Sequence, residues 1–254
     1  MTLLRAAGLN KSFGGVRAVQ NVSIAVPDNS IFALIGPNGA GKSTLLNLLS
    51  GIHQPDTGSL YLGETQLIGV PAHRRVRLGI ARTFQKIRLF RQLTLLENVL
   101  AGFHTHRRVP VWQYVIPGPA FRRDRQRFRD EAHELLTFVG LGARAVGRAG
   151  ALPYGQQRML EIARALATRP RLLLLDEPAA GLNAPEVEFL LQRLEDIGRR
   201  GITVVVVEHN MDLVMNVAHR VCVMDHGETL FEGTPREVQA NPQVIAAYLG
   251  GEFQ

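Results

Sequence analysis

The sequence predicts an α/β fold built on a mostly parallel sheet covered by helices. In the second half of the chain, short strands rich in leucine and valine alternate with helical segments, which is the pattern of a buried parallel sheet. Closer to the N-terminus, apolar runs are broken by the glycine and proline turns that separate strands. Between about residues 94 and 140 the apolar spacing becomes helical, which predicts a helical insertion.

Each expected element is bounded by such a change of pattern. In the first part, a helix is expected at residues 41–51, and strands at 3–9, 18–26, 31–35, 58–62 and 80–84. In the insertion, helices are expected at residues 94–103 and 120–139. In the last part, helices are expected at residues 156–168, 185–198 and 211–218, and strands at 172–176, 202–208 and 220–225.

The composition favours a soluble cytoplasmic domain. Of 254 residues, 46% are hydrophobic and 20% are charged, close to globular averages, so disorder is not indicated. No apolar run approaches the roughly 18 residues that span a bilayer, and we expect no secretory signal. Cys222 stands alone, which excludes an internal disulfide and is typical of a reducing compartment. The net charge of +7 favours an anionic partner without choosing among nucleotide, nucleic acid and membrane.

A glycine-rich segment follows the strand at 31–35 and matches the phosphate-binding pattern G-x-x-x-x-G-K-[ST]. Its glycines let backbone N–H groups curl round phosphate oxygens, and the helix N-terminus adds positive charge. Lys42 can reach the β- and γ-phosphates, and the Ser43 hydroxyl can ligate Mg²⁺. A chance match is on the order of one in a hundred, so the segment predicts a nucleoside triphosphate site. The predicted phosphate-binding residues are Gly36, Pro37, Asn38, Gly39, Ala40, Gly41, Lys42, Ser43 and Thr44.

Two acidic residues, Asp176 and Glu177, lie at the end of the apolar strand at 172–176. The carboxyl end of a parallel strand faces the ligand crevice of such a sheet. There, Asp176 would help to hold Mg²⁺, and Glu177 would act as a general base on the attacking water. A strand that ends in two acids is common, so a solvated strand end is the alternative when this pair is taken alone.

Further markers occur in a fixed order along the chain, and with them the chain resembles the ATPases of ATP-binding-cassette (ABC) transporters over nearly its whole length. They are Phe13, Gln85, the segment 152–158, the segment 180–183 and His209. The resemblance implies that Phe13 stacks on adenine, although a core or turn aromatic is an equal alternative from the sequence. It also implies that Gln85 contacts Mg²⁺ and water where the permease docks, and that His209 touches the γ-phosphate.

The segment 152–158 departs from the common Leu-Ser-Gly-Gly-Gln form of the ABC signature. Pro153 and Tyr154 replace serine and glycine, so the usual hydroxyl is missing, and proline has no N–H. What remains is Gly155 and the start of a helix expected at Gln156, which can still donate backbone N–H groups to an anion. Similar signatures occur in the ATPase subunits of high-affinity branched-chain amino acid importers, and the chain's last segments resemble that branch as well.

The resemblance carries a set of further expectations. The fold would be a P-loop NTPase core with a mostly parallel sheet, an N-terminal antiparallel β subdomain and an inserted α-helical subdomain, with the core at residues 1–92 and 151–254 and the insertion at about 93–150. The cofactors would be ATP and Mg²⁺, with Ser43, Gln85 and Asp176 as metal ligands. The chain would lie on the cytoplasmic face of the inner membrane as a peripheral subunit. Its partners would be a second ABC ATPase subunit in a homo- or heterodimer, transmembrane permease subunits and, indirectly, a solute-binding protein.

Alternatives remain for the function. The chain could serve a system for urea, for other amino acids or amides, or for lipopolysaccharide export. A non-transport ABC ATPase acting on nucleic acid or the ribosome is disfavoured, because such proteins usually carry two cassettes or a long coiled-coil insertion; no nucleic acid partner is expected. A P-loop kinase or GTPase is disfavoured as well, since the signature, Gln85 and His209 have no role there.

The middle of the chain is rich in arginine, and its helix at 120–139 carries Arg122, Arg123, Arg125, Arg127 and Arg129. A solvated helix face is the favoured interpretation, and proximity to anionic lipid or to an acidic permease loop is the alternative. The apolar link 109–121, with Trp112 and Tyr114, could be a docking loop or could pack within the insertion.

Overall fold

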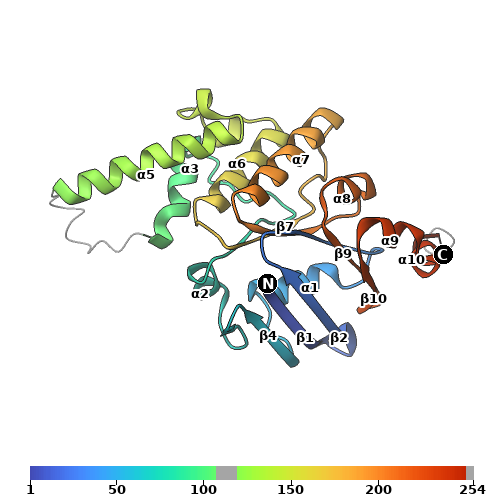
Figure 1. Ribbon diagram of the computed structural model, residues 1–254. Helices are drawn as coiled ribbons and strands as arrows, with labels where there is room; N and C mark the ends of the chain where they lie inside the picture. The colour runs from blue at the N-terminus through green and yellow to red at the C-terminus, as the bar shows by residue number, and fades with distance from the viewer. Residues whose placement is uncertain (107–118, 250–254) are drawn as a thin grey trace. The chain divides into compact units, whose positions relative to one another are not determined.

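The computed structural model of the protein describes residues 1–106 and 119–249 (Figure 1). Trp112 and Tyr114, and with them the docking interpretation of the link, lie outside the described residues. The chain divides into two compact units: Met1–Gln85 with Arg171–Gln254, and Lys86–Pro170. The second unit, here called the helical unit, is wider than the expected insertion at 93–150, because the signature helix belongs to it. The first is called the sheet unit.

The N-terminal sheet of the sheet unit is antiparallel, with strand order β2-β1-β4-β5. Its strands are β1 (Thr2–Phe13), β2 (Val16–Pro27), β4 (Thr57–Leu62) and β5 (Thr65–Gln66). Strands β1 and β2 form a hairpin closed by Gly14 and Gly15, whose φ angles of 48° and 92° lie in the region that glycine adopts without strain. The expected β subdomain is therefore confirmed, with both of its long strands extending beyond the predicted ends.

The second sheet has the order β10-β9-β3-β8-β7-β6, and five of its strands are parallel. They are β3 (Ile31–Ile35), β6 (Ile80–Arg82), β7 (Leu172–Asp176), β8 (Thr203–Val207) and β9 (Arg220–Asp225), and β10 (Glu228–Gly233) pairs antiparallel at the edge. Every residue of β3, β7 and β8 is buried. Their continuous apolar runs are what a strand covered on both faces requires. The predicted mostly parallel sheet is confirmed.

Helix α1 (Lys42–Ser50) follows β3 and contacts strands of both sheets, including β2, β6, β7 and β8. Its leucines, Leu45 and Leu46 among them, join Leu4, Leu174 and Val207 in one apolar core. The other helices of this unit are α2 (Ala72–Arg77), α7 (Ala184–Arg199), α8 (Met211–Val217), α9 (Pro235–Ala240) and α10 (Pro242–Leu249). Strand β10 and helices α2, α9 and α10 were not expected from the sequence.

The helical unit contains α3 (Leu95–Gly102), α5 (Pro119–Phe138) and α6 (Tyr154–Leu166), with short 3₁₀ turns at Phe103–His106, Gly142–Arg144 and Ala149–Ala151. Helix α3 packs against both α5 and α6. The N-cap Thr94 forms a capping box with Glu97, which explains why α3 begins where the sequence placed it. A buried ion pair joins Arg158 to Glu161 at 2.8 Å within α6.

Among the described residues, no helix has both the length and the apolar character that crossing a bilayer requires.

Candidate active site

The candidate site lies at the carboxyl edge of the parallel sheet, where three neighbouring strands end together. Strand β8 lies between β3 and β7, and its last residue, Val207, pairs with Leu34 of β3 and Asp176 of β7. The segments that follow these strands begin with Gly36, Glu177 and Glu208. Because parallel strands point the same way, the glycine-rich loop, the acidic pair and the segment with His209 leave the sheet at one edge.

The glycine-rich loop is held so closely against the sheet unit that two of its positions have no room for a side chain. A Cβ at Gly36 would lie 2.1 Å from the carbonyl oxygen of Met224, and one at Gly41 would lie 2.3 Å from that of Ala18. Gly41, with φ of 93°, is also the N-cap of α1. The loop residues Pro37, Asn38, Gly39 and Ala40 lie between these two contacts, and Ser43 and Thr44 fall in the first turn of α1.

The ammonium of Lys42 is buried, with 8% of the residue exposed, and it donates to the carbonyl oxygens of Gly36 at 2.7 Å and Pro37 at 2.8 Å. Burial lowers the pKa of Lys42, and the charges of Glu177 and Asp176 oppose that shift. The structure therefore brings a lysine of the loop and both predicted acids into one electrostatic environment, as the sequence led us to expect.

Asp176 and Glu177 each have a defined partner. Oδ2 of Asp176 accepts from the guanidinium of Arg82 at 2.9 Å. Glu177 has a left-handed backbone with φ of 46°, and its N–H donates to the carbonyl of Val207 at 2.9 Å. Its Oε2 accepts from Nε2 of Gln85 at 2.9 Å. The positive φ, unusual for a residue with a side chain, turns the chain sharply away from the strand.

Gln85 was expected to close a strand at 80–84, but β6 ends at Arg82. One more hydrogen bond, from the N–H of Thr83 to the carbonyl of Leu174, prolongs the contact with β7. Gln85 therefore reaches Glu177 from a loop rather than from a strand end. The structure thus places this glutamine against the acidic pair, and its contact with Mg²⁺ stays a prediction.

Two charged residues of this edge were not anticipated, Arg82, which is nearly buried, and Glu208, which is buried. Arg82 also donates to Oδ1 of Asn47 at 2.6 Å and Oγ of Ser50 at 2.8 Å, both on α1. Glu208, which is 1% exposed, precedes His209. A charged residue at the end of an otherwise apolar strand is the sequence signal that could have drawn attention to both, since such residues are buried only when they have partners.

Phe13 lies at the end of β1 with 42% of the residue exposed, so it is not a core aromatic. Its ring meets His53 edge-on with centroids 5.2 Å apart, and the ammonium of Lys11 lies 5.3 Å from the ring centroid. An exposed aromatic ring beside a hairpin turn leaves surface for stacking on a base. The described contacts do not join it to Lys42 or to the acidic pair.

The signature residues Gly155 and Gln156 belong to the helical unit, in the first turn of α6. This helix begins at Tyr154, two residues earlier than expected, and Pro153 is its N-cap residue. Pro153 makes no side-chain capping bond to the N–H groups of that turn. Oε1 of Gln156 accepts from Arg144 at 2.7 Å. The uncapped first turn retains the backbone donors that the sequence assigned to an anion.

The predicted Mg²⁺ ligands offer a hydroxyl (Ser43), an amide (Gln85) and a carboxylate (Asp176). Within the described ranges no group of three or more His, Cys, Asp or Glu residues is placed to hold a metal on its own. Mg²⁺ keeps several waters and is commonly bound by one or two carboxylates together with substrate phosphates. Asp176 uses Oδ2 for Arg82, which leaves Oδ1 for a metal. The donor set therefore fits a Mg²⁺ that arrives with a nucleotide.

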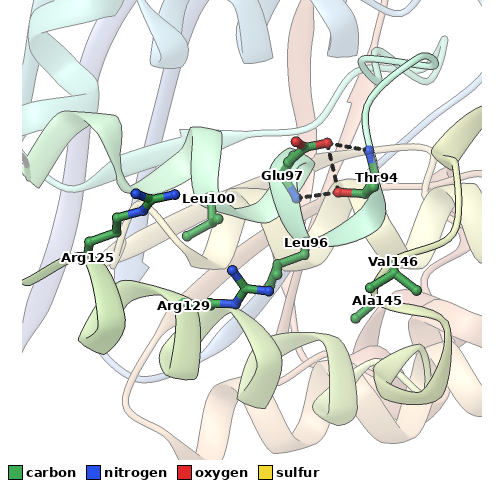
Figure 2. A pocket seen from close by; sticks show the side chains of 8 residues that line it. All are labelled: Thr94, Leu96, Glu97, Leu100, Arg125, Arg129, Ala145 and Val146. Carbon is green, nitrogen blue, oxygen red and sulfur yellow. Dashed lines mark hydrogen bonds between the residues drawn. The ribbon is translucent and has the colours of Figure 1, made fainter. Parts of the chain in front are cut away.

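The helical unit has a hollow of about 270 Å³ between α3, α5 and the turn at Ala145 and Val146 (Figure 2). Leu96 and Leu100 of α3 and Val146 give it apolar walls, and Figure 2 shows Arg125 and Arg129 extending from α5 beside them. Neither arginine forms an ion pair with a described residue, whereas Arg127 pairs with Asp124 and Glu131. Of the arginines on this helix, Arg123, Arg125, Arg127 and Arg129 are exposed, as favoured, and two of them border the hollow.

Comparison with known proteins places the chain in a family. Residues 19–180 match the family model described as ABC transporter, and residues 228–254 match the model described as branched-chain amino acid ATP-binding cassette transporter. The high-affinity branched-chain amino acid transport ATP-binding protein LivG of Salmonella typhimurium is 43% identical, and BraF of Pseudomonas aeruginosa 42%, each over 249 residues covering 98% of both chains. The ADP conformation of the ATP-binding cassette MJ1267 superimposes with a TM-score of 0.86 at 31% identity, covering 98% of this chain and 99% of that one.

The chain therefore belongs to the ABC transporter family, as the order of its motifs indicated. It is an ABC transporter ATPase, and its likeness runs over the full length of branched-chain amino acid transport ATP-binding proteins. Both levels of the resemblance found in the sequence are confirmed.

Proposed function

We propose that this chain binds and hydrolyses Mg-ATP to power an importer of leucine, isoleucine and valine, through permease subunits encoded elsewhere. The observation that carries the proposal is the convergence of Lys42, Asp176 and Glu177 at one sheet edge. A lysine in a glycine-rich loop neutralises the negative charge of the phosphates, and the two acids provide a metal ligand and a general base. The full-length similarity to LivG and BraF supports the choice of solute.

Each residue of the site has a proposed role. Lys42 and the loop N–H groups would hold the β- and γ-phosphates, while Ser43, Gln85 and Asp176 would ligate Mg²⁺, which would polarise the γ-phosphate when bound. Glu177 takes a proton from the attacking water, and its hydrogen bond to Gln85 fixes the direction of one carboxylate oxygen. His209 contacts the γ-phosphate and Phe13 stacks on the adenine ring.

The working unit is proposed to be a head-to-tail pair of ATPase subunits, formed with a second copy or with a related chain. The uncapped N-terminus of α6, with Gly155 and Gln156, would donate backbone N–H groups to the γ-phosphate held by the opposite subunit. A related cassette, MJ0796, is dimeric in a post-hydrolysis state with ADP and phosphate; it has a TM-score of 0.78 and 26% identity to this chain. ATP would join the pair, and hydrolysis would release it.

We place the chain on the cytoplasmic face of the inner membrane. There, the helical unit and Gln85 would transmit the joining and release of the ATPase pair to the permease. Through the permease the chain would act indirectly with a solute-binding protein. The hollow beside Arg125 and Arg129 favours contact with an acidic loop of the permease over a merely solvated face. Two guanidinium groups that form no ion pair with a described residue, beside apolar walls, suit a segment that presents a carboxylate and an apolar side chain together.

The decisive experiment replaces Glu177 with glutamine. The amide keeps the shape of the carboxylate but cannot accept the proton, so we expect Glu177→Gln to bind a fluorescent ATP analogue with affinity near that of the unmodified chain and to release no phosphate in the steady state. Glu64→Gln, at an exposed position, is the matched control and should hydrolyse ATP normally. Normal phosphate release from Glu177→Gln would refute the general-base assignment. Uptake of leucine, isoleucine and valine measured beside urea tests the solute.

A further inference from the structure

Glu208 is a buried carboxylate between the last residue of β8 and His209, and the proposed chemistry gives it no part. It is 1% exposed, yet it forms no ion pair with a described Lys or Arg. Burial raises the pKa of Glu208, and hydrogen bonds from the backbone of Ala179, Asn210 and His209 act against that shift. A carboxylate taken out of water is costly unless its oxygens are well bonded.

The two oxygens of Glu208 bind two different loops. Oε1 accepts from the N–H of Ala179 at 2.8 Å, and Oε2 accepts from the N–H of His209 at 3.2 Å. Ala179 lies two residues after Glu177, in the segment that continues through 180–183 to the N-cap of α7. The N–H of Glu208 itself bonds the carbonyl of Leu34 at 3.3 Å, just before the phosphate loop. One side chain thus links the segments that follow β7 and β8.

A carboxylate suits this position for a chemical reason. It has two acceptor oxygens and no donor, and the backbone groups that bond to it here are all N–H donors. Glutamine in the same shape must point its NH₂ at one of these N–H groups, whichever way the amide is turned. An apolar residue would leave the buried N–H of Ala179 without an acceptor, the arrangement that proteins avoid most consistently.

We propose that Glu208 is a positioning residue that holds His209 and the segment 179–183 at a fixed separation. Through it, contact of His209 with the γ-phosphate would be coupled to the loop that precedes α7. The inference rests on the proposed function, since it assumes that His209 senses the nucleotide. It adds a residue that touches neither nucleotide nor metal and that acts by connecting two loops.

A purely structural role would look different. If Glu208 only stabilised the fold, its loss would lower the amount of folded protein and the affinity for ATP together. If it positions His209, kcat should fall while affinity stays. We therefore expect Glu208→Gln to lower the kcat for ATP roughly tenfold in the purified transporter complex, about the effect of one misplaced catalytic contact. The Kd of a fluorescent ATP analogue should change by less than about threefold. Glu64→Gln is again the exposed control.

The sharper test combines Glu208→Gln with His209→Ala. Residues that act through one contact show non-additive effects, so the double variant should be no slower than His209→Ala alone. If Glu208→Gln folds poorly, Glu208→Asp can replace it, since aspartate keeps both acceptor oxygens on a shorter side chain. Its kcat is then compared in the same way, alone and combined with His209→Ala.

Three results would overturn the inference. They are an unchanged kcat in Glu208→Gln, losses that multiply in the double variant, and affinity that falls in step with kcat. An unchanged kcat in His209→Ala would instead overturn the proposed role of His209, together with the coupling that depends on it. If only the inference fails, the kcat of His209→Ala is still lowered. The kcat of His209→Ala therefore distinguishes failure of the inference from failure of the proposed function.

Discussion

The guanidinium of Arg82 donates to Oδ2 of Asp176 across 2.9 Å, and the same side chain bonds Asn47 and Ser50 of α1. Both members of the ion pair are nearly buried, with side-chain exposures of 9% and 8%. Arg82 therefore fixes the acid at the end of β7 relative to the helix that begins at Lys42. The free carboxylate oxygen keeps a constant direction, which is what a metal ligand requires.

This geometry predicts the behaviour of Arg82→Met. Loss of the arginine breaks the nearly buried ion pair with Asp176, and removing one partner of a buried pair typically costs about 3–5 kcal/mol of folding free energy. If Asp176 is a Mg²⁺ ligand, the gain in ATP-analogue affinity on adding Mg²⁺, relative to the affinity in EDTA, should also shrink. Arg82→Lys, which keeps a charge but not the fork of donors, should fall in between. Arg74→Met, at an exposed position of α2, is the control.

The interpretation of Arg82 fails in one clear case. A full Mg²⁺ effect in a well-folded Arg82→Met would show that Asp176 needs no orientation by Arg82. A lowered melting temperature with an intact Mg²⁺ effect would limit the residue to a structural role. The ratio of the two affinities separates these outcomes, because a general loss of stability affects both measurements equally.

Lys42→Ala tests the phosphate loop itself. The Lys42 ammonium holds the carbonyl oxygens of Gly36 and Pro37, so it supports the loop as well as facing the two acids. Its loss removes a charge-assisted contact to phosphate, and we expect the affinity for an ATP analogue to fall by at least about tenfold. Equilibrium titration of a fluorescent analogue measures this, and an unchanged affinity would contradict the assignment.

The elements that could be predicted best are those whose bounds depend only on the local sequence of one segment. The strands at Leu172–Asp176 and Arg220–Asp225 have the predicted bounds, because each is an apolar run closed by an acid. The edge strand Glu228–Gly233 was missed because its residues are mostly half-buried and carry no such run. The short helices α9 and α10, with 6 and 8 residues, carry too few turns for a clear periodicity.

The candidate site likewise contains features that the local sequence predicts and features that it does not. The glycine loop and the acidic pair could be predicted because spacing within one segment defines them. The partners of Arg82 and Glu208 could not, since Asp176 is 94 residues from Arg82 and Ala179 is 29 residues from Glu208. A charged residue at the end of an apolar strand indicates that it has a partner in the fold. The identity of that partner depends on the order of the strands in the sheet, which the sequence pattern does not show.

Cys222 offers a probe of the sheet unit, because it is the only cysteine of the chain. It is buried in β9, and burial raises the pKa of its thiol to about 12. At pH 8 the folded chain should react with a thiol reagent far more slowly than the unfolded chain, whose thiol pKa is about 8.5. The folded pKa exceeds the unfolded one, so the stability linked to this group is complete below about pH 8.5 and is lost as the pH rises toward 12.

Reaction rates with a chromogenic disulfide, measured with and without denaturant, check the expectation for Cys222. Saturating Mg-ATP should slow the reaction further if labelling requires unfolding, because a ligand that binds only the folded state lowers the unfolded fraction. Rapid labelling of the native chain at pH 8 would contradict the burial of β9.

The last prediction concerns the hollow of the helical unit. Arg125 and Arg129 lie four residues apart on α5, and neither forms an ion pair with a described residue. If an acidic permease loop binds there, the double variant Arg125→Glu and Arg129→Glu should lose most substrate uptake, since like charges would meet at the contact. The ATPase activity of the purified chain should remain within about twofold, because these residues take no part in the nucleotide site as proposed.

The matched control for the hollow reverses Arg127 instead. It lies on the same helix and carries the same charge, but it is already paired with Asp124 and Glu131 and does not line the hollow. Arg127→Glu should therefore reduce uptake much less than the double variant. Equal loss of uptake in both variants would indicate a general effect of charge near the membrane. Unaltered uptake in the double variant would show that this face of α5 is simply solvated, as its composition favoured. Binding of the chain to vesicles of anionic lipid, compared between the same variants, separates the membrane surface from the permease as the source of the negative charge.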